Sequence, residues 1–173
     1  MFKEIPIADL DWSPFPRTKG NWFLVTAGKP GASNALLGTL GGFLALWGGN
    51  CVEIFIRESR FTKHLLDEES HFSISVLPPE YKDAVHYCGT HSGKDGSKWT
   101  AAGLTETAID GIPTCAEASL TLLCRKLASV NTDRMDMAPD IHEAYYTGRW
   151  EGNPYTLYIG EIVKVMKASK EGK

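Results

Sequence analysis

Phe72-Ser73-Ile74-Ser75-Val76 decides the fold class, because apolar and small polar residues alternate strictly along this stretch. Successive side chains of a β-strand point to opposite faces of a sheet, so the alternation predicts a half-buried antiparallel strand. Further strands are predicted, with turn residues between most of them, at Trp22–Ala27, Cys51–Arg57, Leu120–Leu127 and Tyr155–Met166. Many antiparallel strands in one small domain close into a barrel or stack as a sandwich, which protects their edges. We favour a barrel in a mainly β protein.

Three short helices are predicted between the strands, at Thr62–Glu69, Glu80–Cys88 and Ser97–Ala102. Thr62 and Ser97 are residue types that cap helix N-termini, and Pro79 suits a first helical turn. Gly103 stands where a left-handed residue commonly follows a helix. The polar segment Asn131–Asp140 is interpreted as a surface excursion, so residues 1–173 are expected to form a single domain.

The composition is that of an ordinary folded protein. The chain has 173 residues, of which 43% are hydrophobic and 23% are charged, enough to bury a core without disulfides or metals. A formal net charge of -3 argues against a nucleic-acid partner, which would need many Lys and Arg side chains to neutralise its phosphates. Met1–Leu10 lacks the apolar core of a secretory signal, and no apolar run approaches the roughly 20 residues of a membrane span. We expect a cytoplasmic protein with no membrane partner.

Cysteine and histidine patterns point to neither a disulfide nor a metal. Four cysteines without a Cys-x-x-Cys spacing are expected to be buried and reduced, at Cys51, Cys88, Cys115 and Cys124. His86, Cys88 and His91 form a small cluster, but no fourth ligand is evident and the spacing matches no recognised zinc pattern. The sequence also has no Gly-x-Ser-x-Gly nucleophile elbow, so hydrolase chemistry has no support.

The segment Arg57-Glu58-Ser59-Arg60-Phe61-Thr62-Lys63 combines two arginines and two hydroxyls where a strand ends and a helix begins. Helix N-termini present unpaired N–H groups and the positive end of the helix dipole, and the guanidinium fork of Arg matches phosphate oxygens. The segment therefore suits a phosphate monoester. Taken alone, it is equally a pair of solvated arginines beside a capping threonine.

A second segment, Cys88–Lys98, places glycines, hydroxyls and lysines just before a predicted helix start. Glycines allow a concave nest of backbone N–H groups that binds anions, and lysine adds a point charge. The order of residues differs from the Gly-x4-Gly-Lys-Ser/Thr pattern of nucleoside triphosphate sites. The alternative is an ordinary surface loop.

The third segment, Ser33–Gly42, is apolar and rich in glycine. Such a loop lets the backbone approach a flat ring closely, although a buried turn would have the same composition.

These segments, taken in order, resemble the flavin reductase-like, FMN-binding split-barrel family and are flavoredoxin-like. Four motifs carry the resemblance across nearly the whole chain: Asn34–Thr39, Phe55–Arg57 running into Ser59–Thr62, Tyr87–Asp95, and Tyr158–Ile162. The resemblance implies a split β-barrel with a few short helices, a homodimer, and FMN bound near the subunit interface.

The resemblance also implies which residues hold the cofactor. The phosphate is expected near Arg57, Ser59, Arg60 and Thr62, with a second segment closing around it at Ser92, Gly93 and Lys94. The isoalloxazine ring is expected to lie along the backbone of Asn34, Ala35, Leu36, Leu37, Gly38 and Thr39, whose N–H groups could tune its potential. The flavin supplies the chemistry in this family, so no side chain is expected to act as a catalytic residue.

The chain departs from the family pattern at the ring. Family members similar to flavoredoxin have Met, Thr, Ser and Trp where this chain has Leu36, Leu37, Thr39 and Leu40, and a His before the last motif is replaced by Tyr155 or a neighbour. The leading hypothesis is an FMN-dependent oxidoreductase that takes hydride from NADH or NADPH, or electrons from a redox protein. The alternatives are a non-catalytic flavin carrier or sensor, and a related barrel that binds another anionic ring such as haem.

An aromatic-rich region near the C-terminus bears on assembly. Exposed aromatic side chains often mark interfaces, so Tyr145, Tyr146 and Trp150 are candidates for the homodimer contact, with core packing as the alternative.

Overall fold

The computed structural model describes residues 1–11 and 22–169, and these form a mainly β protein. Eight strands make one antiparallel sheet in the order β3-β2-β6-β9-β10-β5-β4, with β1 also paired to β10, and β7 and β8 form a separate hairpin. The strands are β1 Phe2–Ile5, β2 Phe23–Lys29, β3 Ala32–Gly38, β4 Gly41–Leu46, β5 Gly49–Arg57, β6 His71–Val76, β7 Glu106–Ile109, β8 Ile112–Cys115, β9 Leu120–Asn131 and β10 Tyr155–Ala168.

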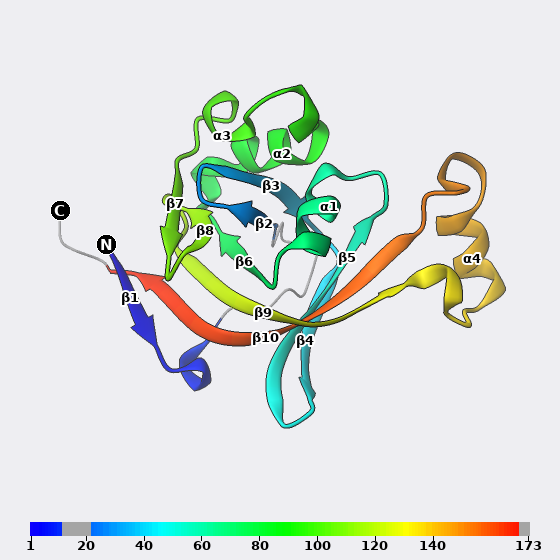
Figure 1. Ribbon diagram of the computed structural model, residues 1–173, viewed down its shortest axis with the longest axis horizontal. Coiled ribbons are helices and arrows are strands. Elements are labelled where there is room, and N and C mark those ends of the chain that lie inside the picture. The colour runs from blue at the N-terminus through cyan, green and yellow to red at the C-terminus, as the bar shows by residue number, and fades with distance from the viewer. Residues whose placement is uncertain (12–21, 170–173) are drawn as a thin grey trace.

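The helices are short. They are α1 Phe61–Glu68, α2 Lys82–Thr90, α3 Lys98–Ala101 and α4 Pro139–Tyr146. Single 3₁₀ turns lie at Ile7–Asp9, Pro79–Tyr81, Gly93–Asp95, Thr132–Arg134 and Gly148–Trp150. In Figure 1, α2 and α3 lie over the end of the sheet that holds β2 and β3, whereas α4 lies apart at the far end of β9 and β10.

The long strands β9 and β10 let the sheet curve into a barrel. Their register shifts between Ile159 and Gly160 and again between Ile162 and Lys164, and such irregularities bend a strand. At the first shift the ring of Phe72 packs directly on Gly160, where an added Cβ would lie 2.6 Å from the Phe72 Cζ atom. The curvature brings part of β4 and β5 across from β2 and β6, while the tip of the β4–β5 hairpin extends beyond β9 and β10 (Figure 1).

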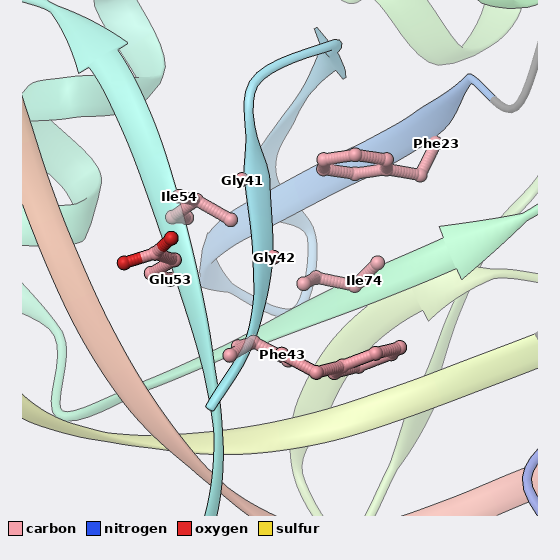
Figure 2. A pocket seen from close by; sticks show the side chains of 8 residues that line it. Phe23, Gly41, Gly42, Phe43, Glu53, Ile54 and Ile74 are labelled. Carbon is pink, nitrogen blue, oxygen red and sulfur yellow. The ribbon is translucent and has the colours of Figure 1, made fainter. Parts of the chain in front are cut away.

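Figure 2 shows the inside of this curve, where Phe23 of β2 and Ile74 of β6 lie across from Gly41 and Ile54 of the β4–β5 hairpin. The space left between them is about 10 Å³, no more than a single water molecule needs. Among the described residues, β3 and β4 at the two ends of the sheet do not pair with each other. The mainly β fold is therefore a split barrel, as predicted.

Strand β6 is buried on both faces, so the prediction of a half-buried strand at Phe72–Val76 is wrong. Phe72 and Ile74 belong to the core inside the barrel, and the serine face is covered by β8. Ser73 Oγ donates to the Pro113 carbonyl at 2.7 Å, and Ser75 Oγ lies 2.9 Å from Thr114 Oγ1. The alternating pattern predicts that the two serines face solvent, because no residue near them in the sequence indicates the β7–β8 hairpin. That hairpin supplies the hydrogen-bond partners of both serine hydroxyls.

A second core lies outside the barrel, between the β2–β3 edge and the helices α2 and α3. It is built from Leu24, Ala35, Val85, Cys88, Trp99, Leu104, Cys115 and Ala118. All four cysteines are free and buried, as predicted. In the described part of the chain, no helix is long and apolar enough to cross a membrane.

The helix predictions hold in place but not in detail. Helix α1 begins at Phe61 with Arg60 at the N-cap position, so Thr62 lies inside the first turn and is not the cap. Ser97 does stand at the N-cap of α3, although its side chain makes no capping hydrogen bond. Gly103 follows α3 with a φ of +68°, which confirms the left-handed residue. Helix α4 was not predicted, because the polar residues before it suggested only a surface excursion.

Candidate functional site

The segment predicted as a ring-binding loop is instead a strand at the edge of the sheet. Asn34 to Gly38 belong to β3, and each pairs with a residue of β2, from Ala27 opposite Asn34 to Phe23 opposite Gly38. Glycine is required at position 38 because the Phe23 ring occupies the place of any Cβ. The assignment of these residues to a loop is wrong because glycine content was taken as a turn signal, whereas here Gly38 makes room for an aromatic ring in a pleated sheet. Their placement along a flavin ring stays a prediction.

A cavity of about 150 Å³ opens where β3 leaves the sheet. It brings two predicted segments together: Leu36, Leu37 and Thr39 from the ring segment, and Arg57, Ser59 and Arg60 from the strand-to-helix segment. Its remaining walls are Leu40, Phe55, Ile56, Trp150 and Tyr155. The other predicted site residues do not line this cavity; they are Asn34, Ala35, Gly38, Thr62, Ser92, Gly93 and Lys94.

Several of these other residues meet at the start of α1. Asn34 Nδ2 donates to Thr62 Oγ1 at 2.7 Å, and both side chains are buried. Gly93 packs so closely on the Asn34 amide and the Phe61 ring that any side chain there would collide with them. The three predicted segments therefore converge on one end of one short helix.

The helix start is free to bind an anion. Arg60 at the N-cap of α1 makes no side-chain capping hydrogen bond, and the Lys63 N–H donates to the Arg60 carbonyl at 3.0 Å. Among the described residues, this leaves the N–H groups of Phe61 and Thr62 without an acceptor. Arg60 is exposed, and its Nη1 donates a hydrogen bond to the Gly89 carbonyl at 3.0 Å. Lys94 is exposed, and its backbone N–H donates to Ser92 Oγ at 3.2 Å in a small turn. Arg60, Lys94 and the helix dipole thus give this end of the molecule a positive field.

Arg57 is more enclosed than its neighbours, with only 6% of its surface exposed. Its guanidinium lies between the Trp150 and Tyr155 rings, at 4.0 Å and 3.9 Å from their centroids. Nη1 donates to the Asn153 carbonyl at 2.6 Å and Nη2 to the Tyr145 carbonyl at 3.0 Å. Arg57 therefore fixes the segment that joins α4 to β10.

Ser59 is bound to the same segment. Its backbone N–H donates to Asn153 Oδ1 at 3.0 Å, and Asn153 Nδ2 donates back to Ser59 Oγ at 3.0 Å. The side-chain oxygen of Asn153 thus accepts a hydrogen bond from the Ser59 N–H, and its backbone carbonyl accepts one from the Arg57 guanidinium. Of the arginines that line the cavity, Arg60 is the one whose guanidinium is exposed.

The flavin reductase-like domain model matches residues 15–173 of this chain. The chain belongs to the flavin reductase-like family.

Solved structures support the fold of this flavin reductase-like chain at low identity. An FMN-binding domain of a flavin reductase-like enzyme from Shewanella baltica OS155 superposes with a TM-score of 0.68 at 17% identity, covering 96% of this chain and 77% of that one. Flavoredoxin of Desulfovibrio vulgaris (Miyazaki F) gives 0.68 at 18% identity, covering 86% and 70%. An NADH:FAD oxidoreductase of Streptomyces globisporus gives 0.63 at 16% identity, covering 86% and 75%. No curated protein matches the sequence.

Lys98 is a buried charged residue close to the segments predicted to bind the cofactor, although it does not line the cavity. It is 4% exposed, and its Nζ donates to the Cys88 carbonyl at 2.8 Å and the Ala35 carbonyl at 3.1 Å. Burial lowers the pKa of this amine, and the nearby positive charge of Arg60 lowers it further. Lys98 ties α2 and α3 to the edge strand β3, and no sequence signal distinguishes it from a surface lysine.

A charged network below the cavity holds α1 on the sheet. Lys63 Nζ lies 2.9 Å from Glu58 Oε2 and 2.7 Å from Asp67 Oδ2, and the buried Tyr158 donates to Asp67 Oδ1 at 2.6 Å. Burial alone would raise the pKa of both carboxyls. Hydrogen bonds from Thr156 and Lys63 to Glu58, and from Lys63 and Tyr158 to Asp67, hold both values below the ordinary range.

The histidines and cysteines set aside as metal ligands have other contacts. The His91 ring stacks on Tyr87 with centroids 3.7 Å apart, and Cys88 is fully buried in the second core. Over residues 1–11 and 22–169, no three His, Cys, Asp or Glu side chains are grouped so as to hold a metal.

The sequence reasoning missed three residues that line or brace the cavity: Trp150, Asn153 and Tyr155. Trp150 and Tyr155 had been noted only as a possible interface residue and as a replacement for a histidine. Their signal was weak, because their role depends on Arg57, which lies about 100 residues earlier and meets them only in the folded chain.

Proposed function

We propose that this chain binds FMN and passes hydride or electrons through it, from NADH, NADPH or a redox protein to an acceptor. The observation that carries the proposal is the cavity of about 150 Å³, which places the ring segment opposite the arginine-bearing start of α1. Family membership supports it, as do similar structures described as an FMN-binding domain and a flavoredoxin.

The residues present fit such a cofactor. The start of α1, the exposed Arg60 and the nearby Lys94 would together supply backbone and charged donors to the phosphate of FMN. The cavity wall formed by Leu36, Leu37 and Leu40 is apolar, as suits one face of a flat ring. The cavity is smaller than the roughly 300–1,000 Å³ of closed ligand pockets, so it would enclose only part of FMN and leave the phosphate at the surface.

When bound, the flavin would accept and release the hydride or the electrons, and the chain's own residues would hold and orient it. Arg60 and the α1 start would fix the phosphate. Lys98 would keep β3 in place beside the ring through its bond to the Ala35 carbonyl. Leu36 and Leu40 would keep water from one side of the cavity.

The test begins with the absorption spectrum of protein expressed in riboflavin-supplemented cells, followed by heat release and chromatography of the cofactor. We expect a yellow protein that releases FMN. Reconstitution of the apoprotein with FMN, FAD and riboflavin then compares three ligands that share one ring. A colourless protein that takes up none of the three contradicts the proposal, and a Soret band would favour haem.

A non-catalytic flavin carrier or sensor is the second candidate. It is favoured by the aliphatic side chains of Leu37 and Leu40 at the cavity, because flavoredoxin-like members have Thr and Trp at these positions, and both can donate hydrogen bonds. Stopped-flow mixing of the FMN-loaded protein with NADH and with NADPH separates the two functions. An oxidoreductase bleaches the flavin faster than free FMN reacts, whereas a carrier does not.

We also propose that the chain forms a homodimer. Tyr145 is 48% exposed and Ile141 is 45% exposed on the same short helix, whereas Tyr146 and Trp150 are partly buried. An exposed aromatic and an aliphatic side chain side by side are typical of an interface. The same two side chains also line a groove between α4 and β5, so the proposed contact would border that groove. Light scattering at micromolar concentration should return twice the chain mass, and a monomer mass would contradict the proposal.

A further inference from the structure

A second hollow adjoins the cavity and has a different character. This aromatic groove has a volume of about 350 Å³, within the range of sites for small organic ligands. Its lining residues are Leu40, Gly41, Glu53, Phe55, Ile141, Tyr145, Tyr146 and Tyr155. It shares Leu40, Phe55 and Tyr155 with the cavity, so one wall separates the two.

The aromatic side chains of the groove are held in fixed positions. The Phe55 and Tyr155 rings meet edge to face with centroids 6.3 Å apart, and Tyr146 meets Tyr155 in the same way at 6.1 Å. The Tyr146 hydroxyl donates to Thr132 Oγ1 at 3.0 Å, which fixes that ring from its far end. Arg57 already covers one face of Tyr155 and His142 stacks on one face of Tyr146, so each of these rings has only its other face to offer to a ligand. The face of an aromatic ring attracts cations.

Glu53 is the one charged residue that lines the groove. Its carboxylate makes no hydrogen bond or ion pair with any residue in the described part of the chain. Figure 2 shows this carboxylate on the outer side of β5, pointing away from Phe23 and Ile74 in the barrel. The side chain therefore faces the groove side of the strand.

The nearest arginine on the same strand does not neutralise Glu53. Glu53 and Arg57 lie four residues apart on one face of β5, which separates them by about 13 Å at the usual strand rise. Arg57 is also engaged with two backbone carbonyls and two aromatic rings. The groove therefore combines aromatic faces with an unpaired negative charge.

We propose that the aromatic groove is a binding site for a small organic cation that carries a planar aromatic ring, with Glu53 as its counterion. Aromatic faces and a carboxylate both favour a cation, and the same carboxylate disfavours an anion such as a phosphate ester. The size of the groove suits one or two fused rings. Binding of such a cation to the groove does not require a bound flavin.

The test uses isothermal titration calorimetry at low salt and pH 8 with two ligands of the same shape, N-methylquinolinium and neutral quinoline. We expect the cation to bind at least about fivefold more tightly, which corresponds to roughly 1 kcal/mol of cation–aromatic and charge attraction. Added salt should weaken the binding of the cation and leave that of quinoline nearly unchanged. Equal affinities, or no binding of the cation at millimolar concentration, would overturn the proposal.

Two variants and one control assign the effect to the groove. Glu53→Gln keeps the shape of the side chain and should remove most of the preference for the cation. Glu143→Gln changes the net charge equally on nearby α4, outside the groove lining, and should keep the preference. Tyr145→Leu removes a ring while keeping the carbonyl that Arg57 binds, and it tests the site should Glu53→Gln fail to fold. A preference that survives the loss of Glu53 or of the Tyr145 ring contradicts the proposal.

Discussion

The cavity and the aromatic groove share a wall but differ in charge. The cavity is lined by Arg57 and Arg60 beside a helix start, whereas the groove is lined by Glu53 and aromatic rings. Glu53 and Arg57 both belong to β5, where they and Phe55 occupy alternate positions on one face, whereas Arg60 stands at the start of α1. Two opposite charges on one strand can thus belong to two different sites. Here Phe55 lies between them, Arg57 faces the cavity and Glu53 faces the groove.

Removing the exposed charge of the cavity should have the largest effect. Arg60→Ala is expected to weaken FMN binding by roughly 10- to 100-fold, because a hydrogen bond to a charged group contributes about 1.5–3 kcal/mol. Riboflavin, which lacks the phosphate, should lose much less affinity. Fluorescence titration of the apoprotein measures both.

The matched control for Arg60→Ala is Arg125→Ala. Arg125 is also exposed, but it pairs with Glu161 on the neighbouring strand and does not line the cavity. An equal loss of FMN affinity in the two variants would mean that net charge, and not the site, attracts the cofactor.

The wall between the two hollows depends on the shape of Arg57. Arg57→Lys keeps the charge but loses the planar group between Trp150 and Tyr155, so we expect a loss of about 2 kcal/mol in the free energy of unfolding. Hydrogen exchange should rise in residues 139–153, because the bonds to the Tyr145 and Asn153 carbonyls are weakened.

Arg149→Lys is the control for this wall. Arg149 also lies near the Trp150 ring, at 4.6 Å from its centroid, but it is exposed and bridges no other element. Its replacement should leave both stability and exchange almost unchanged, and an effect as large as that of Arg57→Lys would argue against the sandwich.

A smaller effect is expected from Lys63, which fixes α1 under the cavity but contacts no part of the groove. Lys63→Met removes the partner of Glu58 and Asp67 and should cost about 1 kcal/mol of stability at pH 7, since the network is partly exposed. Lys29→Met, at an exposed lysine outside this network, should cost nothing measurable.

The pH dependence of this difference has a definite sign. The pKa values of Glu58 and Asp67 are lowered by folding, so both carboxyls bind fewer protons in the folded chain than in the unfolded one. Their contribution is present above the usual carboxyl range near pH ~4 and is lost as the pH falls through the lowered values. Urea titrations should therefore show the gap between wild type and Lys63→Met closing below about pH 4; a gap that widens there would contradict the assignment.

The sequence by itself determined the class of the fold and the segments of the site. Alternation in β6 and strand-rich runs elsewhere were enough for a mainly β barrel, because strand periodicity is a local property. The split barrel followed from the resemblance of four motifs, in order, to the flavin reductase-like family. Free, buried cysteines and the left-handed Gly103 were also predicted correctly, for the same reason.

Only the tertiary structure decided how those segments are used. It turned the predicted ring loop into the edge strand β3, buried both faces of β6, and made Arg57 an anchor between Trp150 and Tyr155. Within residues 1–11 and 22–169, it also left Glu53 without a partner beside aromatic rings from α4 and β10. Each of these outcomes depends on contacts between residues far apart in the chain, and the pattern around any one residue does not encode which distant surface will cover it.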